Sequence, residues 1–254
     1  MGTELVKIDS AVPATAELLA AAGLTEEELA AQTGVMGMEG VRQEHIQIPR
    51  LAIAQPLSPQ MIRSKPEYIE GLMVGQYFNT VTREVYGDVV TVVPVKYSMS
   101  RIKFTNNALD CRSKNGIDGG HYAETCKTCQ FSKWGSGREG KGTDCKEYLN
   151  FLVVETSTLQ PMVISFKSAS LSAGKTWSTL ILGRKIVLSN GDRKPAPAFM
   201  TTYSLKTVEK SSGSGVYYVP VVSVAGPSDT QLVTEGMALH KSFKGELDSD
   251  AQDE

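Results

Sequence analysis

The sequence predicts a mainly β protein with added helices, in the form of a small β-barrel or sandwich that carries a long inserted loop. Several short segments are rich in β-branched and aromatic side chains and end at Gly, Pro or Ser clusters, as strands do. A single strongly helical segment stands among these strands. A Gly-rich basic stretch with few large aliphatic side chains interrupts them, which marks an insertion without its own core. With 41% hydrophobic residues, a sizeable core is available to this chain.

Residues 1–45 predict an acidic helical arm. The segment Ala14–Ala22 is rich in Ala, Leu and Glu, and Gly23 is a suitable helix terminator. Thr25 is followed three residues later by Glu28, which is the capping-box pattern and opens a second short helix. The sequence assigns no role to this arm.

Residues 46–244 form the predicted core. A strand interrupted by proline opens it, and the last two strands are joined through the flexible loop Ser211–Gly215. The expected strands are 46–53, 89–97, 101–104, 148–155, 162–167, 199–209 and 216–224. Helices are expected over 172–182 and 229–243.

The insertion, at about residues 105–147, contains all four cysteines of the chain. Their spacing is C-x14-C-x2-C-x15-C, in which the central C-x2-C pair can place two thiolates on one side of a tight turn. The flanking cysteines can then complete a tetrahedron, so a structural Zn²⁺ is predicted, with a closed shell that leaves no position for a catalytic water. The predicted ligands are Cys111, Cys126, Cys129 and Cys145.

Other arrangements of these cysteines stay open. Two disulfides would need an oxidising compartment, and the N-terminus lacks the basic and apolar regions of a secretory signal. A redox-active C-x2-C pair would need a strand before it and a helix after it. His121 lies inside the cluster and could replace one cysteine as a ligand.

The charge of the chain is unevenly distributed. Residues 96–210 carry 18 basic and 9 acidic side chains, whereas residues 1–95 carry 6 basic and 12 acidic ones. Aromatic and basic residues alternate in the middle of the chain, a mixture that suits single-stranded nucleic acid because cations contact phosphates and bases stack on rings. The predicted contacts are Lys96, Tyr97, Arg101, Lys103, Phe104, Arg112, Lys133, Trp134, Lys167, Lys175, Trp177, Arg184 and Lys185.

No enzyme signature is found, so a non-enzymatic protein is predicted. Gly174-Lys175-Thr176 matches the end of a phosphate-binding loop, but Ala169 stands where that motif requires glycine. The Ser172–Lys175 segment fits a serine–lysine hydrolase pattern without the companion motifs. The three histidines are scattered.

Residues 245–254 carry five acids and no base, and we expect them to form a disordered acidic tail. Such a tail can compete with nucleic acid for the basic core, and it is a candidate docking site for replication enzymes. No run reaches the roughly 18 apolar residues of a membrane span, so no membrane association is expected.

Together these features resemble phage single-stranded DNA-binding proteins with an oligonucleotide/oligosaccharide-binding (OB) fold. Four segments also look like those of tailed-phage replication proteins: 48–51, 92–95, 111–113 and 164–168. The resemblance covers residues 46–254 and implies an OB-fold-like β-barrel that carries a zinc-binding insertion. Many such proteins end in an aromatic residue, whereas this chain ends in Asp253-Glu254.

The predicted function is therefore sequence-nonspecific binding of single-stranded DNA, which protects and presents it during phage DNA replication or recombination. The expected location is the cytoplasm of an infected bacterial cell, and self-association is left open. The alternative is a zinc-ribbon interaction module that contacts RNA polymerase or another replication protein. A nuclease subunit would need clustered carboxylates, and Asp110, Asp118 and Asp144 are scattered around the cysteines.

Overall fold

The computed structural model describes residues 16–31, 35–38, 40–41, 47–106, 108–213, 215–244 and 247. The chain divides into two compact units, Met1–Gln47 and Ile48–Glu254. The first unit contains helices α1 (Ala16–Ala22) and α2 (Glu26–Ala31). Thr25 Oγ1 accepts a hydrogen bond from the Glu28 amide (3.1 Å), and the Thr25 amide donates to Glu28 Oε2 (2.8 Å). The capping box predicted at the start of the second helix is thus confirmed.

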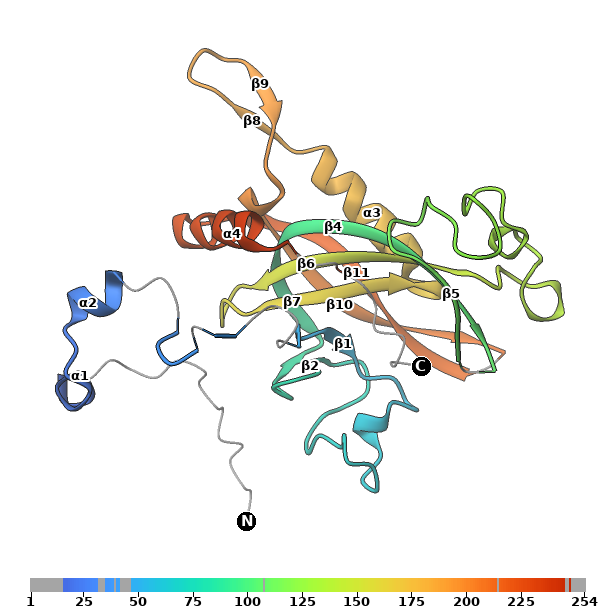
Figure 1. The fold of residues 1–254 in the computed structure, drawn as a ribbon, viewed down its shortest axis with the longest axis horizontal. Coiled ribbons are helices and arrows are strands. Elements are labelled where there is room, and N and C mark those ends of the chain that lie inside the picture. The colour runs from blue at the N-terminus through green and yellow to red at the C-terminus, as the bar shows by residue number, and fades with distance from the viewer. Residues whose placement is uncertain are drawn as a thin grey trace. The chain divides into compact units, whose positions relative to one another are not determined.

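The second unit is built around a six-stranded antiparallel sheet (Figure 1). Its order is β11-β10-β4-β6-β7, and β5 pairs with the end of β4. The strands are β4 (Val89–Thr105), β5 (Ala108–Ser113), β6 (Lys146–Glu155), β7 (Pro161–Lys167), β10 (Thr201–Ser212) and β11 (Gly215–Pro227). Four of the predicted strands lie within β6, β7, β10 and β11, apart from two residues at the start of the 199–209 segment.

Strand β4 unites the two segments predicted at 89–97 and 101–104 into one strand of 17 residues. Its pairing with β6 shifts register between Pro94 and Lys96. Proline has no amide hydrogen for a central ladder, and a bulge removes the need for one. The bulge therefore lets a long central strand pass through a proline.

Two helices pack on this sheet. Helix α3 (Leu171–Leu182) follows β7 in the chain and contacts β6, β7 and β11, whereas α4 (Thr230–Ser242) contacts β4 and β6. Gly174 allows the close approach of α3, because a Cβ there would lie 2.8 Å from the Cβ of Phe166. The Asp229 side chain caps α4 by accepting from the Leu232 amide (2.8 Å). Both helices were predicted.

The core consists of aromatic and aliphatic side chains from the sheet and α3. Trp177 is completely buried, stacks on Phe151 with ring centroids 4.4 Å apart, and contacts the edges of Phe166 and Tyr203. A second cluster joins alternate residues of the same strands to α4 and includes Val93, Leu152 and Leu232. The sheet therefore buries side chains on both of its faces.

A smaller sheet and a hairpin complete the unit. The small sheet contains β1 (Leu51–Ile53), β2 (Tyr77–Asn79) and β3 (Val85–Gly87). The hairpin of β8 (Lys185–Val187) and β9 (Arg193–Pro195) projects beyond the end of α3 (Figure 1). Of the strand predicted at 46–53, Leu51–Ile53 adopts strand structure, and Ile46 lies outside the described residues.

The prediction of a mainly β protein with added helices is confirmed. In the described part of the second unit the sheets are open, and no closed barrel is present. Helix α3 contacts both edge strands, β7 and β11, without a hydrogen-bonded ladder between them. Among the described residues, no helix is both long enough and apolar enough to cross a membrane.

Candidate nucleic-acid interface

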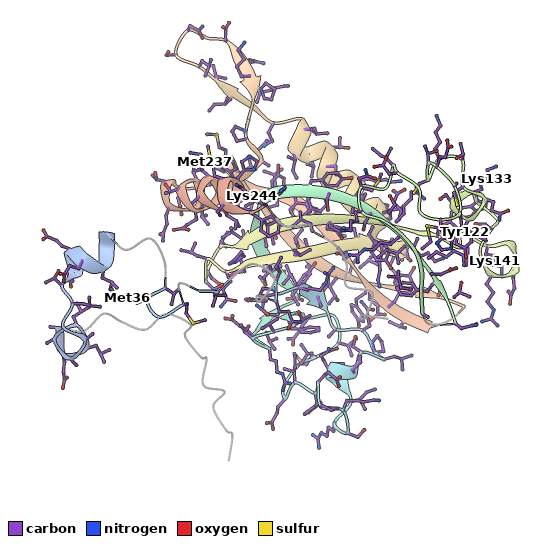
Figure 2. All side chains as sticks on the ribbon, in the orientation of Figure 1. Met36, Tyr122, Lys133, Lys141, Met237 and Lys244 are labelled. Carbon is purple, nitrogen blue, oxygen red and sulfur yellow. The ribbon has the colours of Figure 1, made fainter. Side chains whose placement is uncertain are left out.

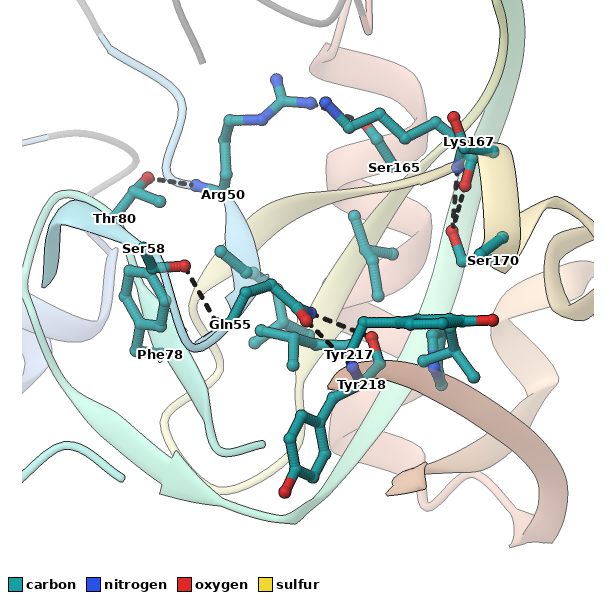
Figure 3. Close-up of a pocket in the computed structure, with 18 of the residues that line it drawn as sticks. Arg50, Gln55, Ser58, Phe78, Thr80, Ser165, Lys167, Ser170, Tyr217 and Tyr218 are labelled. Atoms are coloured by element: carbon teal, nitrogen blue, oxygen red, sulfur yellow. Dashed lines mark hydrogen bonds between the residues drawn. The ribbon is translucent and has the colours of Figure 1, made fainter. Parts of the chain in front are cut away.

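A cleft of about 740 Å³ opens between the small sheet, the ends of β4, β6 and β7, and the tip of the β10–β11 hairpin (Figure 3). Among the described residues, five aromatic side chains line it: Phe78, Phe104, Tyr148, Tyr217 and Tyr218. Its charged lining residues are Arg50, Lys167 and Glu67. Its volume lies within the usual range of small-ligand sites. This combination of rings and cations makes the cleft the candidate site.

Arg50 is held in place from the small sheet and from β7. Its amide donates to Thr80 Oγ1 (3.0 Å), its carbonyl accepts from the Thr80 amide (3.0 Å), and it forms a parallel bridge with Val163. The Arg50 guanidinium donates to Ser165 Oγ (2.5 Å). The cation is therefore fixed at the mouth of the cleft before any ligand binds.

Lys167 approaches from the end of β7. Its amide donates to Ser170 Oγ (2.9 Å), and Ser170 Oγ donates back to its carbonyl (2.9 Å). Its ammonium lies 5.5 Å from the centre of the Tyr148 ring, within cation–π range. The next residue, Ser168, has a φ of 47°, which is unusual for a residue other than glycine.

The aromatic residues of the cleft have two roles. Phe78 and Tyr148 are buried and form part of its wall, whereas Phe104, Tyr217 and Tyr218 keep partly exposed rings. The backbone of Tyr218 is clamped by Gln55, whose side-chain amide donates to the Tyr218 carbonyl and accepts from its amide (both 2.9 Å). The partly exposed rings are the surfaces on which a ligand can stack.

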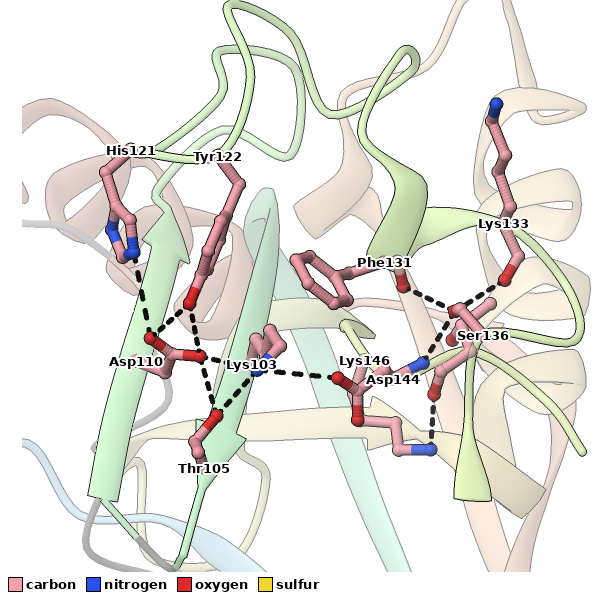
Figure 4. Close-up of polar contacts among 11 residues, drawn as sticks. Lys103, Thr105, Asp110, His121, Tyr122, Phe131, Lys133, Ser136, Asp144 and Lys146 are labelled. Atoms are coloured by element: carbon pink, nitrogen blue, oxygen red, sulfur yellow. Dashed lines mark hydrogen bonds and ion pairs between the residues drawn. The ribbon is translucent and has the colours of Figure 1, made fainter. Parts of the chain in front are cut away.

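Lys103 lies outside the cleft in a polar cluster beside the insertion (Figure 4). It is 6% exposed, and its ammonium lies 2.5 Å from Asp110 Oδ2 and 3.4 Å from Asp144 Oδ2. It also lies 4.7 Å from the centre of the Phe131 ring. Lys103 therefore connects the insertion to the sheet and is not available to a phosphate, contrary to its prediction as a contact.

Asp110 is the acidic centre of the same cluster. Hydrogen bonds from Lys103, Thr105 and Tyr122 hold the pKa of its carboxyl well below its usual range. The Tyr122 hydroxyl is 2.8 Å from Asp110 Oδ1, and its pKa is raised by this bond. The cluster joins the β4–β5 ribbon to residues 114–145, which we term the cysteine-rich lobe.

The four cysteines are all free thiols, and Cys126, Cys129 and Cys145 are buried. Burial raises the pKa of the Cys145 thiol to about 11, with further increases from the other three cysteines and an opposing effect of Arg101. Gly120 lies so close to Cys111 Sγ that a Cβ would collide with it. The four sulfurs are thus gathered in one region, although no group of three His, Cys, Asp or Glu side chains among the described residues forms a ready metal site.

The donor set is nevertheless compatible with zinc. Four thiols, three of them buried, are the typical ligands of a closed structural site. The lobe contains no helix or strand longer than a single 3-10 turn, and its hydrogen bonds are mostly between residues close in sequence. Its outer edge presents Lys133 and Lys141 (Figure 2). Trp134, which follows Lys133 in the sequence, is 84% exposed.

The structure separates the other predicted contacts. Tyr97 is 49% exposed, and its ring packs on Phe151. The Glu147 carboxylate lies 2.5 Å from the Arg101 guanidinium and 3.6 Å from the Lys175 ammonium. These cations share one acid on the α3 side of the sheet.

Trp177 is a core residue with no exposed face, so its prediction as a stacking residue is corrected. The periodic spacing of Gly174, Trp177 and Ile181 on α3 was the overlooked sign of a buried helix face.

Four further predicted contacts lie elsewhere. The Lys96 ammonium donates to the Phe243 carbonyl (3.1 Å) beside α4, and Arg112 is half-buried on β5. Arg184 and Lys185 lie at the base of the β8–β9 hairpin. Phe104 and Lys167 are the predicted contacts that line the cleft.

Sequence reasoning missed Arg50, Tyr217 and Tyr218. The two tyrosines stand next to the Ser/Gly loop of a predicted hairpin, and that position was an available signal. The acidic tail lies outside the described residues except for Leu247, which is buried and accepts a hydrogen bond from Ser98 Oγ (3.2 Å).

Comparison with known proteins identifies the family. The family model of the Pam3 phage gp34-like protein matches residues 18–247. No curated protein and no solved structure matches the chain significantly. The match covers nearly all of the second unit and also most of α1 and all of α2 in the first. The chain therefore belongs to the Pam3 phage gp34-like family and is a bacteriophage protein.

Proposed function

We propose that this protein binds single-stranded DNA with little sequence preference and protects and presents it during phage DNA replication or recombination. The observation that carries the proposal is the cleft, in which partly exposed rings and two cations surround an open space of about 740 Å³. Rings stack on bases of any sequence, and cations contact the phosphates that every strand carries. A duplex, whose bases are already stacked, cannot use such rings.

We further propose that the sheet has an OB-like topology. Three antiparallel neighbours, β4, β6 and β7, are followed by helix α3 and then by β10 and β11, which return to the other side of β4. OB folds bind oligonucleotides on the face of their second and third strands and on the loops after the first and fourth strands. In this correspondence, Tyr148 and Lys167 lie on the second and third strands, and Tyr217 follows the loop after the fourth.

The third part of the proposal is a structural Zn²⁺ held by Cys111, Cys126, Cys129 and Cys145. The burial of three thiols and their concentration in one lobe support it. Zinc would supply the cross-link that a lobe with little apolar core needs, because structural sites contribute folding free energy directly. It would have no catalytic role.

Fluorescence anisotropy with labelled oligo-dT and with a duplex of equal length, each over a range of salt concentrations, tests the function. We expect tight oligo-dT binding that weakens steeply with salt, and weaker duplex binding. Phe104→Leu should weaken oligo-dT binding, because leucine offers no π-face. Leu182→Ala, at a residue 77% exposed at the end of α3, is the matched control. Absence of oligo-dT binding at low salt would overturn the proposal.

A second candidate function is supported by the surface of the cysteine-rich lobe. Trp134 is 84% exposed and Ile117 is 64% exposed, and large apolar side chains at such positions often mark protein contacts. The lobe could therefore be a zinc-ribbon module that contacts a replication protein or RNA polymerase. Failure of oligo-dT binding, with loss of a purified partner's binding in Trp134→Ala, would favour this function.

A further inference from the structure

We propose that Arg50 and Lys167, which flank Ser165 at the polar end of the cleft, bind one phosphate, while Phe104 and Tyr217 stack the bases next to it. The inference rests on the proposed function and assigns its ligand: a phosphate that carries an unpaired base. Arg50 belongs to the segment that precedes β1, outside the six-stranded sheet. One of the two cations of the site therefore comes from outside the six-stranded sheet.

Two cations converge at this end. The side chains of Arg50 and Lys167 point toward one another across Ser165 (Figure 3). Of the described residues that line the cleft, Glu67 is the acidic one. A phosphate placed between two converging cations is attracted by both of them. Phosphate suits the pair, because arginine offers paired donors and lysine a compact charge.

A buried polar chain supports the phosphate end from inside the sheet. Ser165 Oγ donates to Asn150 Oδ1 (2.6 Å), and Asn150 Nδ2 donates to Ser100 Oγ (3.1 Å). Asn150 and Ser100 are both completely buried. With its proton directed to Asn150, the Ser165 oxygen is left to accept from Arg50, as it does at 2.5 Å. The Ser165 hydroxyl, which positions the guanidinium, is thus oriented by two buried residues that no ligand touches.

The neighbouring rings determine which phosphates fit. Phe104 lies at the end of β4 and Tyr217 near the start of β11, so the cleft has a ring on each of two separate elements. A base can stack on such a ring only when it has left its duplex. The site should accordingly accept an internal phosphate of a single strand or the phosphate of a free nucleotide, and the test separates these two sources.

The first experiment measures the salt dependence of dT12 binding by fluorescence anisotropy. For single strands, each phosphate contact contributes about 0.7 to the slope of log K against log salt. Arg50→Gln and Lys167→Gln should each reduce this slope by about 0.7. Tyr217→Leu should weaken binding about fivefold or more without changing the slope, because stacking releases no counterions. Lys241→Gln, an exposed cation in the last turn of α4, is the charge-matched control and should leave affinity and slope unchanged.

The second experiment titrates the protein with dTMP, thymidine and inorganic phosphate and follows amide chemical shifts. Strong dT12 binding with weak dTMP binding identifies an internal phosphate, and tight dTMP binding identifies a free nucleotide. If dT12 binds and all three cleft variants match Lys241→Gln, the phosphate site is wrong and the proposed function stands. If dT12 does not bind but dTMP shifts the cleft amides, the proposed function is wrong and the site stands. If the protein binds neither probe, both are wrong.

Discussion

The six-stranded sheet and the cysteine-rich lobe place the two tryptophans of the chain in opposite surroundings. Trp177 is completely buried among Phe151, Phe166 and Tyr203, whereas Trp134 in the lobe is 84% exposed. The sheet has long ladders and buried faces, and the lobe has short turns and a few buried side chains, mainly its thiols. The sheet is stabilised by the area it removes from water, and the lobe must be stabilised by specific polar and sulfur contacts.

Lys103 shows how the two regions are joined. Its ammonium is shared between Asp110 on β5 and Asp144 in the lobe, beneath the Phe131 ring. A buried charge without partners is costly, so this cation favours the arrangement in which both carboxylates surround it. Together with the hydrogen bond from Tyr122 to Asp110, this ammonium orients the lobe on the sheet.

The largest effect is expected from removing the buried ring of the sheet. Trp177→Ala should lower the free energy of unfolding by about 3–5 kcal/mol, through lost burial and the cavity left behind. Urea unfolding followed by far-UV circular dichroism measures this change. Leu182→Ala on the same helix, at a residue 77% exposed, should stay within about 0.5 kcal/mol of the parent. A small effect of Trp177→Ala would mean that α3 is not part of the core.

An intermediate effect, confined to the lobe, is expected when one thiol is replaced. The parent should contain about one zinc per chain, and Cys126→Ser should lose it together with the amide-exchange protection of residues 114–145. The protection of β4, β6 and β10 should change little. Thr128→Ala, in the same turn, is the control that keeps all four thiols. Metal-free parent protein with a protected lobe, or disulfide-linked peptides, would contradict the zinc proposal.

The smallest effect on stability is expected at the exposed ring. Trp134→Ala should change the free energy of unfolding by no more than about 0.5 kcal/mol, because little of its surface is buried. If the lobe contacts DNA, the same variant should weaken oligo-dT binding about fivefold or more. A large loss of stability would show that this ring covers the interior of the lobe, and unchanged DNA affinity would restrict the interface to the cleft.

Much of the sheet could be predicted, because long strands and helices carry local patterns. β6, β7, α3 and α4 were anticipated closely from their apolar runs and helical spacing. β5 was missed because the apolar–polar alternation of Leu109–Arg112 is only four residues long, and the segment adopts strand structure by pairing with the end of β4. The β8–β9 hairpin was missed because its strands are only three residues long.

The site was less predictable, because it depends on contacts between distant residues. Lys167 and Phe104 were chosen for their chemistry and do line the cleft. Arg50 meets Ser165 across 115 positions of sequence, and no local pattern reports such a contact. The same reasoning wrongly placed Trp177 and Lys103 at the interface, because a side chain's chemistry does not reveal its burial.

The Gln55 clamp on Tyr218 also affects how copies of this protein behave together. β11 is an edge strand of 13 residues, and an edge of that length exposes unpaired amides to another chain and promotes aggregation. Gln55 pairs with both the backbone amide and the backbone carbonyl of Tyr218. Pro220 and Pro227 have no amide hydrogen to donate. On the opposite edge, the Val163 amide donates to the Pro49 carbonyl. Gln55 and Pro49, on either side of β1, thus each pair with an edge strand of the sheet and leave fewer unpaired backbone groups for edge-to-edge association.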